Sequence, residues 1–490
     1  MLQLSNTHIA STFDTITTIV MRFSTLHFAF LATLSSIFTV VAASDTTTCS
    51  SSKHCPEDKP CCSQFGICGT GAYCLGGCDI RYSYNLTACM PMPRMSTFQE
   101  SFDSKDKVKE IELQSDYLGN STEADWVYTG WVDYYDNSLL IQMPNHTTGT
   151  VVSSTKYLWY GKVGATLKTS HDGGVVTAFI LFSDVQDEID YEFVGYNLTN
   201  PQSNYYSQGI LNYNNSRNSS VNNTFEYYHN YEMDWTEDKI EWYIDGEKVR
   251  TLNKNDTWNE TSNRYDYPQT PSRIQFSLWP GGDSSNAKGT IEWAGGLINW
   301  DSEDIKKYGY YYAHIKEIYA TAYDIPNDVK LDGNSTKESD YHAFLYNSTD
   351  GDASNVMLTT KKTWLGSDDA TGFDPQNDDE DSSSNKAQET TITSVSGSST
   401  ITSVKTDSTK KTANVPAQNT AAAAQATAKS STGTNTYDPS AGVGGFVQDS
   451  KSTDSGSSGS SSQGVANSLN ESVISGIFAS ICLGILSFFM

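Results

Sequence analysis

The sequence predicts an all-β protein, in which an antiparallel sandwich is preceded by a small disulfide-rich module and followed by a disordered Ser/Thr-rich stalk. Eight of the nine cysteines fall between Cys49 and Cys89, and residues 97–323 contain nine of the ten tryptophans. In this second region, short alternating apolar runs are separated by Gly, Asn and Asp turns, which is typical of a sandwich. Residues 382–463 are mostly Ser, Thr, Ala, Gly and Lys and contain no Trp, so they can bury too little apolar surface to fold.

Charge excludes one large class of function. The 490 residues carry 32 Lys and Arg against 58 Asp and Glu, which gives a formal net charge of −26. A polyanion of this size repels nucleic acid, because nucleic-acid binding requires a basic surface. We therefore expect no nucleic-acid partner.

The N-terminal 43 residues resemble a secretory signal peptide. Met21-Arg22-Phe23 supplies a basic start, an apolar stretch follows, and Val41-Ala42-Ala43-Ser44 has the small residues of a cleavage site. We expect residues 1–43 to be removed, with translation starting either at Met1 or at Met21. The alternative interpretation is a buried core helix.

The other end predicts a lipid anchor. An uncharged apolar tail runs from Val473 to Met490, behind a polar spacer and the small residues Gly464-Val465-Ala466. Small residues, spacer and terminal apolar tail are the pattern of a GPI-anchor signal, so we expect residues 464–490 to form one, with attachment at Gly464. An ordinary transmembrane helix is the alternative.

The cysteines indicate an oxidising compartment. The ninth, Cys482, lies in the tail that anchoring would remove, which leaves an even set within 41 residues. After a signal peptide, this density predicts a disulfide scaffold rather than a metal site. We place this module at residues 44–93. Asn-x-Ser/Thr sites, typical of exposed loops in secreted proteins, include Asn120, Asn145, Asn197, Asn255 and Asn334.

Residues 97–325 are expected to form the sandwich. Strand-like runs include Thr177–Phe182, Ile240–Ile244 and Arg273–Trp279. Asp245-Gly246, directly after the second of these runs, predicts a tight hairpin turn. Beyond this region, we expect residues 326–463 to be a linker that is first acidic, with nine acids against two lysines over 350–381, and then rich in Ser and Thr.

The chemistry is expected in the segment Asp187-Glu188-Ile189-Asp190-Tyr191-Glu192-Phe193. Its alternation predicts a strand on which Glu188, Asp190 and Glu192 share one face. Neighbouring carboxylates repel, so the pKa of one of them rises and it can hold a proton near neutral pH. An acid and a nucleophile are the pair that glycosidic cleavage uses.

Spacing alone leaves the mechanism open. Strand residues four apart have α-carbons roughly 13 Å apart, whereas a retaining pair needs carboxyls about 5–5.5 Å apart. Two other interpretations of the motif are a solvated acidic strand and a Ca²⁺ site.

The motif resembles the E-x-D-x-E signature of glycoside hydrolase family 16. Other segments agree: Pro201–Tyr206 is similar to the Gln-x-Asn segment of plant xyloglucan endotransglycosylases, and the segments His229–Trp235 and Ile240–Gly246 resemble the family's hairpin. Ser277–Gly282 and Glu292–Gly296 resemble its later cleft strands. With a chitin-binding-like module and an anchor, the chain resembles the fungal Crh family of cell-wall chitin–glucan transglycosylases.

This resemblance implies a concave β-jelly roll and a retaining mechanism. By position, Glu188 would be the nucleophile, Glu192 the acid/base, and Asp190 the residue that orients Glu188. The residues implied to bind substrate are Gln202, Asn204, Tyr206, Trp279 and Trp293. For each Trp, packing in an aromatic-rich core is the alternative. No metal or other cofactor is expected.

The cysteine segment resembles the hevein-type chitin-binding module through Cys61-Cys62-Ser63-Gln64-Phe65-Gly66-Ile67-Cys68-Gly69 and Tyr73-Cys74. By position, Ser63, Phe65 and Tyr73 would face the sugar, because ring faces suit the C–H faces of sugars. Eight cysteines allow 105 pairings; the resemblance implies Cys49–Cys62, Cys55–Cys68, Cys61–Cys74 and Cys78–Cys89. Ile67 replaces a further aromatic residue of many members. A disulfide knot without a ligand is the alternative.

Together these features predict an extracellular enzyme of the cell wall and the outer face of the plasma membrane. Its expected activity is cutting β-1,4-linked chitin and joining it to β-glucan or to other chitin, and its expected partners are these polysaccharides and, through the GPI lipid, the membrane. A hydrolase with the same residues and a catalytically inactive chitin-binding wall adhesin are the alternatives.

Overall fold

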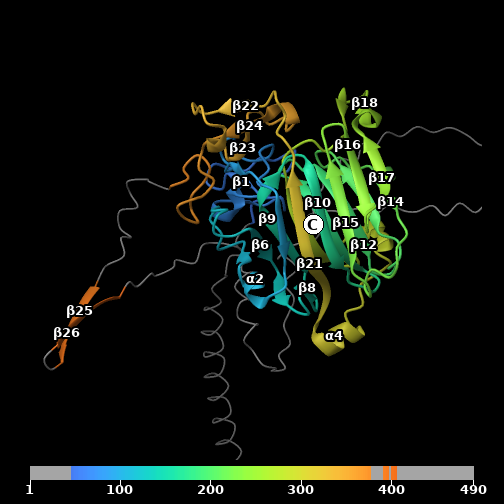
Figure 1. Ribbon diagram of the computed structural model, residues 1–490, viewed down its shortest axis with the longest axis horizontal. Coiled ribbons are helices and arrows are strands. Elements are labelled where there is room, and N and C mark those ends of the chain that lie inside the picture. Colours follow the sequence, from blue (N-terminus) through green and yellow to red (C-terminus); the bar gives the residue numbers. More distant parts are fainter. Residues whose placement is uncertain (1–45, 377–389, 397–398, 406–490) are drawn as a thin grey trace, which may run out of the picture. The chain divides into compact units, whose positions relative to one another are not determined.

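The computed structural model describes residues 46–376 and the backbone of 390–396 and 399–405 (Figure 1). The predicted signal peptide (1–43) and anchor signal (464–490, with Gly464) lie outside the described residues. Among the residues described, no helix is both long enough and apolar enough to cross a membrane.

The predicted all-β sandwich is confirmed: two eight-stranded sheets share one large apolar core (Figure 1). Sheet A consists, in spatial order, of β14 (Arg217–Asn218), β13 (Gln202–Tyr206), β12 (Glu188–Val194), β11 (Val175–Ser183), β20 (Ser272–Pro280), β9 (Thr150–Leu158), β6 (Trp126–Thr129) and β5 (Glu112–Leu113). Sheet B consists of β17 (Glu247–Asn253), β16 (Lys239–Ile244), β15 (His229–Trp235), β10 (Gly161–Lys168), β21 (Tyr310–Ala322), β8 (Leu139–Pro144) and β7 (Trp131–Tyr134), and β4 (Phe98–Ser101) pairs with β21.

Alternation along the strands explains how the sheets pack. On β12, Ile189, Tyr191 and Phe193 are buried in the same core cluster as Tyr231 and Trp242 of sheet B. A strand directs successive side chains to opposite faces, so the acidic residues between them project from the other face of sheet A.

The predicted hairpin is also confirmed. Ile244 of β16 pairs with Glu247 of β17, and the two residues between them, Asp245 and Gly246, have φ values of 51° and 83°. A two-residue hairpin turn of type I′ needs positive φ at both positions, which Asp and Gly tolerate.

One predicted strand is wrong. Glu292–Gly296, which resembled a cleft strand, is the end of helix α3 (Lys288–Trp293) and the turn after it. Gly295 and Gly296 have φ values of 91° and 108°, a left-handed conformation that glycine adopts without strain and that differs from the extended backbone of a regular β-strand. Within the part of the chain that the structure describes, the other helices are α2 (Lys105–Lys109) and α4 (Glu303–Tyr308). The short 3₁₀ turns in that part are Gly71–Cys74, Tyr213–Asn215, Lys254–Thr257, Glu338–Asp340 and Ala353–Asn355.

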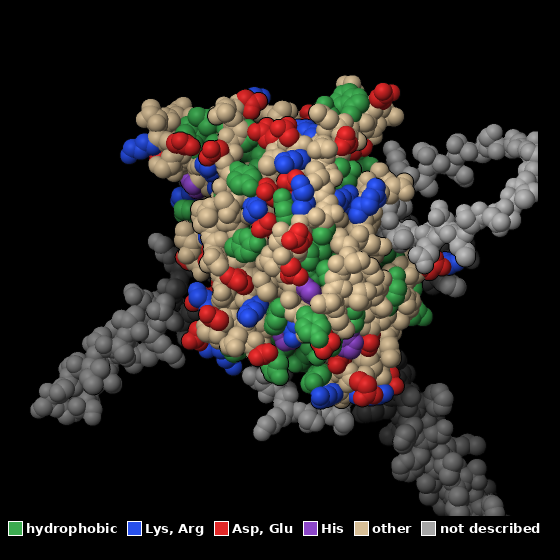
Figure 2. Space-filling view, turned by 45° about the vertical axis from the view of Figure 1, so that its right-hand side comes forward, with side chains coloured by type: hydrophobic (Ala, Val, Ile, Leu, Met, Phe, Trp, Pro, Cys, Tyr) green, Lys and Arg blue, Asp and Glu red, His purple; other side chains and the backbone are tan. Residues whose placement is uncertain are grey.

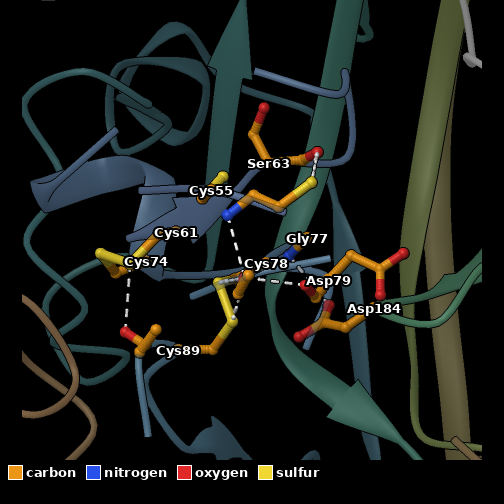
Figure 3. Close-up of a disulfide and its surroundings, with 12 residues drawn as sticks. Cys55, Cys61, Ser63, Cys74, Gly77, Cys78, Asp79, Cys89 and Asp184 are labelled. Carbon is orange, nitrogen blue, oxygen red and sulfur yellow. Dashed lines mark hydrogen bonds between the residues drawn. A yellow bond between two sulfur atoms is a disulfide. The ribbon is translucent and has the colours of Figure 1, made fainter. Parts of the chain in front are cut away.

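The disulfide module, defined here as Cys49–Cys89, is built around β1 (Cys61–Cys62) and β2 (Cys68–Gly69) (Figure 3). Its disulfides are the four that the resemblance implies: Cys49–Cys62, Cys55–Cys68, Cys61–Cys74 and Cys78–Cys89. Three of them join cysteines 13 residues apart and interlock around β1 and β2. These cross-links replace the apolar core that so short a segment cannot build.

The prediction that a linker begins at residue 326 is wrong for residues 326–376. A four-stranded sheet forms there from β22 (Lys330–Asp332), β24 (Val356–Thr359), β23 (Ala343–Tyr346) and β3 (Met92–Pro93). Phe344, Tyr346 and Leu358 are buried in the sandwich core cluster. The residues that cover these three side chains lie far away in the sequence. The polar composition of residues 326–376 therefore gives no sign that the three side chains are buried.

Residues 361–376 form a strap across the disulfide module. The Gly71 N–H donates to the Ala370 carbonyl and the Gly372 N–H to the Ala88 carbonyl. Farther along the predicted stalk, β25 (Thr390–Ser396) and β26 (Ser399–Lys405) pair as a hairpin. A further small pair is β18 (Trp258–Asn259) with β19 (Arg264–Tyr265).

Charged side chains of both signs lie on the surface of the folded part. Figure 2 shows acidic and basic side chains interspersed with apolar ones over one face of the folded part. On that face, the net negative charge does not form one continuous patch.

Candidate active site

Three carboxylates of β12 define the candidate site. Glu188, Asp190 and Glu192 alternate with the core residues and are only 0%, 0% and 2% exposed. The strand therefore carries the predicted acidic face, but the burial contradicts the alternative of a solvated acidic strand.

The neighbouring strand β13 brings three predicted substrate-binding residues to the same face. Tyr206 lies opposite Glu188, Asn204 opposite Asp190, and Gln202 opposite Glu192. Directly opposed residues on antiparallel strands project to the same side, with β-carbons about 4.5–5.5 Å apart. Sheet pairing thus joins segments that are adjacent in sequence but separated by a turn.

The two predicted tryptophan platforms lie on this face as well. Trp279 of β20 and Trp293 of α3 stack with ring centroids 6.0 Å apart and an interplanar angle of 25°. They belong to an apolar cluster with Val176 and Val194 that is separate from the sandwich core. Trp293 Nε1 donates to Gln202 Oε1 at 2.9 Å, which ties this cluster to the residue opposite Glu192.

The carboxylate oxygens are unusual in being buried and unpaired. Among the described residues, neither oxygen of Glu188 or Asp190 has a hydrogen-bond partner, and Oε1 of Glu192 has none. Buried polar atoms are almost always hydrogen-bonded in folded proteins, because leaving them unpaired costs free energy. Such exceptions are expected where a ligand completes the bonding.

Burial determines how these groups titrate. It raises the pKa of Glu188 well above its ordinary value, and the charge of Asp190 adds to the effect. Burial raises the pKa of Asp190 to about 8, against the opposing charge of Arg250. Burial, with the charges of Asp190 and Glu188, also raises the pKa of Glu192 well above its ordinary value. The set can therefore hold a proton at neutral pH, as a general acid must.

These pKa shifts predict a stability effect for Asp190→Asn. An acid whose pKa is raised from 3.8 to about 8 on folding destabilises the native state progressively as pH rises between those values. Asn stays neutral, so the variant should be more stable than wild type by up to about 4 kcal/mol at pH 7, and the difference should vanish towards pH 4. Urea unfolding at a series of pH values measures this.

Glu241→Gln is the matched control, because its effect on stability at pH 7 should have the opposite sign to that of Asp190→Asn. Hydrogen bonds from Lys239 and Lys248 lower the pKa of Glu241 to about 2, so its contribution is present above its unfolded pKa and is lost as pH falls. A difference between Asp190→Asn and wild type that does not change with pH would contradict the assigned burial effect.

The motif strand is fixed from behind by residues that the sequence analysis missed. Trp242 Nε1 donates to the backbone carbonyl of Asp190 at 3.2 Å, and the Tyr191 hydroxyl donates to the Tyr243 carbonyl at 2.9 Å. The Arg250 guanidinium lies 4.4 Å from the centroid of the Trp242 ring. Periodicity marked Trp242 as a strand residue but could not indicate its partner.

Asp187 has a different role from the other acids of the motif. Its carboxylate accepts hydrogen bonds from the N–H groups of Gln208 and Gln269, both at 2.9 Å, and from the Thr270 hydroxyl at 2.6 Å. It therefore anchors the loops at the start of β12.

The three residues predicted to bind chitin in the disulfide module are half-buried. Ser63 Oγ accepts a hydrogen bond from the Ile67 N–H at 3.3 Å, which closes the loop that carries Phe65. Tyr73 packs against an apolar cluster that includes Tyr117 and Leu365, and burial raises its pKa to about 12. Their role in sugar binding stays a prediction.

Buried carboxylates on one strand, with amide and aromatic side chains on the same face, define an enzyme that acts on glycosidic bonds through a carboxylate pair. Comparison with known proteins agrees: residues 120–295 match the model of glycosyl hydrolases family 16. The chain is 49% identical over 351 residues to Congo red hypersensitive protein 2 of Saccharomyces cerevisiae, covering 71% of this chain and 73% of that protein.

A second relative is Crh-like protein 2 of Aspergillus fumigatus, with 50% identity over 346 residues, 70% of this chain and 76% of that protein. The chain therefore belongs to glycosyl hydrolase family 16 and, within it, to the Crh-like proteins. A solved structure of Crh5 transglycosylase in complex with NAG has 26% identity and a TM-score of 0.45, covering 57% of this chain and 99% of that one.

Proposed function

We propose that this enzyme is a retaining transglycosylase of the fungal cell wall, which cleaves β-1,4-linked chitin and transfers the fragment to β-glucan or to other chitin. The observation that carries the proposal is the placement of Glu188 and Glu192 on one buried face of β12, with Asp190 between them. The chain's membership of the Crh-like proteins supports the proposal.

The first step uses both glutamates. Glu188, as a carboxylate, attacks the anomeric carbon and forms a glycosyl ester. The glycosidic bond breaks at the same time, and Glu192 gives its proton to the departing sugar oxygen. Asp190 orients Glu188. Because its own pKa is raised, Asp190 can share the proton that the three carboxyl groups hold.

The second step reverses the proton transfer. Glu192, now a carboxylate, removes the proton from an acceptor hydroxyl, whose oxygen attacks the anomeric carbon and releases Glu188. Transfer requires that the acceptor outcompetes water. Gln202, Asn204 and Tyr206 would bind sugar hydroxyls, and Trp279 and Trp293 would stack on sugar rings.

The alternative is hydrolysis by the same residues, with water as the usual acceptor. A wall adhesin with an inactive site is disfavoured, because all three carboxylates are present on one strand face. We also propose secretion, attachment of the mature chain by a GPI lipid at Gly464, and chitin contact by Ser63, Phe65 and Tyr73 of the disulfide module.

Product analysis tests the activity. The secreted chain is incubated with chitin and fluorescent β-glucan oligosaccharides, and label in the insoluble polymer and new reducing ends are measured. We expect label to enter the polymer with few new reducing ends. Reducing ends that accumulate equally with and without acceptor would instead establish a hydrolase.

A further inference from the structure

The disulfide module is joined to the sandwich beside the candidate active site. The Gly77 N–H donates to Asp184 Oδ1 at 2.9 Å and to the Tyr157 hydroxyl at 3.1 Å (Figure 3). Asp184 lies in the turn that leads into β12. On the other side of that strand, Arg81 Nη1 donates to the Gln208 carbonyl, just after β13, at 3.1 Å. These contacts place the module at the Glu188 end of the motif strand.

Gln64 extends from the module to the carboxylate face of sheet A. Its Oε1 accepts hydrogen bonds from Arg273 Nη2 at 2.6 Å and from Gln275 Nε2 at 3.1 Å. Gln64, Arg273 and Gln275 are all nearly fully buried, with exposures of 6%, 2% and 0%. A β-carbon added at Gly76 would lie 2.6 Å from the Arg273 guanidinium, so the module approaches this arginine as closely as backbone can.

The register of sheet A locates Gln275 relative to the carboxylates. Gln275 of β20 pairs with Ile180 of β11, and Ile180 pairs with Asp190 of β12. Directly paired residues share a face, so Gln275 projects from the same face as Asp190, two strands away. At about 4.8 Å per strand, the separation along the sheet is roughly 10 Å.

The chemistry of arginine fixes the orientation of both amides. A guanidinium only donates hydrogen bonds, so the Gln64 atom facing Arg273 must be its oxygen. That oxygen also faces Gln275, so the Gln275 atom in contact must be its NH₂ group. Oε1 of Gln275 is then directed elsewhere, and among the described residues it is buried without a hydrogen-bond partner. On the same strand, Ser277 Oγ is also buried and unpaired.

We propose that Gln275 forms a polysaccharide subsite on the β20 side of the carboxylates, in which its Oε1 accepts a hydrogen bond from a sugar hydroxyl. Gln64 of the disulfide module is the positioning residue that holds the Gln275 amide in this orientation. The module thus contributes a residue to the carboxylate face of sheet A, in addition to any chitin that it binds itself. This inference rests on the proposed polysaccharide substrate.

Kinetics with oligosaccharides of increasing length test the proposal. The full secreted chain is assayed with a donor series at fixed acceptor and an acceptor series at fixed donor. In either the donor series or the acceptor series, Gln275→Ala and Gln64→Ala should raise KM roughly fivefold to tenfold, as expected for one lost hydrogen bond. The increase should be confined to oligomers long enough to extend two strands from the cut bond. KM for the shortest oligomers and kcat should stay unchanged.

Two further variants separate positioning from a structural role. Gln64→Glu keeps an acceptor oxygen for both Arg273 and Gln275, so it should restore the length dependence of KM. Gln142→Ala, on the half-buried face of β8 in sheet B, should leave the kinetics unchanged. All variants are compared at a temperature at which circular dichroism shows them folded.

The outcomes are distinguishable. If Gln275→Ala and Gln64→Ala have the same KM as wild type, or raise it equally for short and long oligomers, the subsite does not exist. If wild type itself transfers no label with any oligomer, the proposed function fails instead.

Discussion

Replacing Glu188 by Gln should abolish glycosyl transfer while leaving the fold intact. The amide has nearly the shape of the carboxylate but cannot attack the anomeric carbon, so the covalent intermediate cannot form. We expect a loss of transfer on the order of 10⁴-fold or more, as for removal of a nucleophile in other enzymes with covalent intermediates. Transfer of a labelled chitin oligomer to β-glucan measures the loss.

Stability distinguishes lost chemistry from lost structure. Removing a buried charge that has no partner should not lower the unfolding temperature of Glu188→Gln. Glu232→Gln is the matched control, because Glu232 lies on β15 of sheet B, where it pairs with Lys162. It should keep full activity. Unchanged transfer by Glu188→Gln would refute the assignment of the nucleophile.

Replacing Glu192 by Gln should produce a defect that depends on the leaving group. With chitin as donor, loss of the general acid should slow transfer by about 10²- to 10⁴-fold. An aryl glycoside with an acidic phenol needs no protonation to depart, so the first step should proceed nearly as in wild type. The second step still lacks its base, so the glycosyl ester on Glu188 should accumulate.

Rapid-mixing measurements check this prediction. We expect a burst of phenol close to one equivalent per enzyme, followed by slow turnover, and a covalent adduct visible by mass spectrometry. Glu188→Gln should give no burst with the same donor. An equal loss of rate for chitin and for the aryl glycoside would contradict the acid/base role of Glu192.

The parts of the fold that depend on local pattern could be predicted. The apolar residues on β12, β16 and β20 alternate visibly, because each of these strands presents one face to the sandwich core. The Asp245-Gly246 hairpin needs only two residues with tolerated positive φ. The four disulfide pairs came from the family resemblance alone, since eight cysteines allow 105 pairings and the resemblance implied the pairs that the structure contains.

The errors arose where composition conceals long-range pairing. Residues 326–376 contain many acids and short apolar runs, so their sequence resembles a linker. Phe344 is nevertheless buried, because β23 pairs with Met92–Pro93, about 250 residues earlier in the chain. Trp293 was placed on a strand, because its flanking segment resembles one; in the structure, a helix end directs its ring onto Trp279.

The sequence by itself determined the strand, the alternation and the shared face of Glu188, Asp190 and Glu192, because the period of a β-strand follows from backbone geometry alone. Only the tertiary structure decided the burial that raises their pKa values, since desolvation depends on what the fold packs around a group. It also decided the contact of Gln64 with Gln275, 211 residues apart. No local pattern records such a pair, because the disulfide module and β20 meet only in the folded chain.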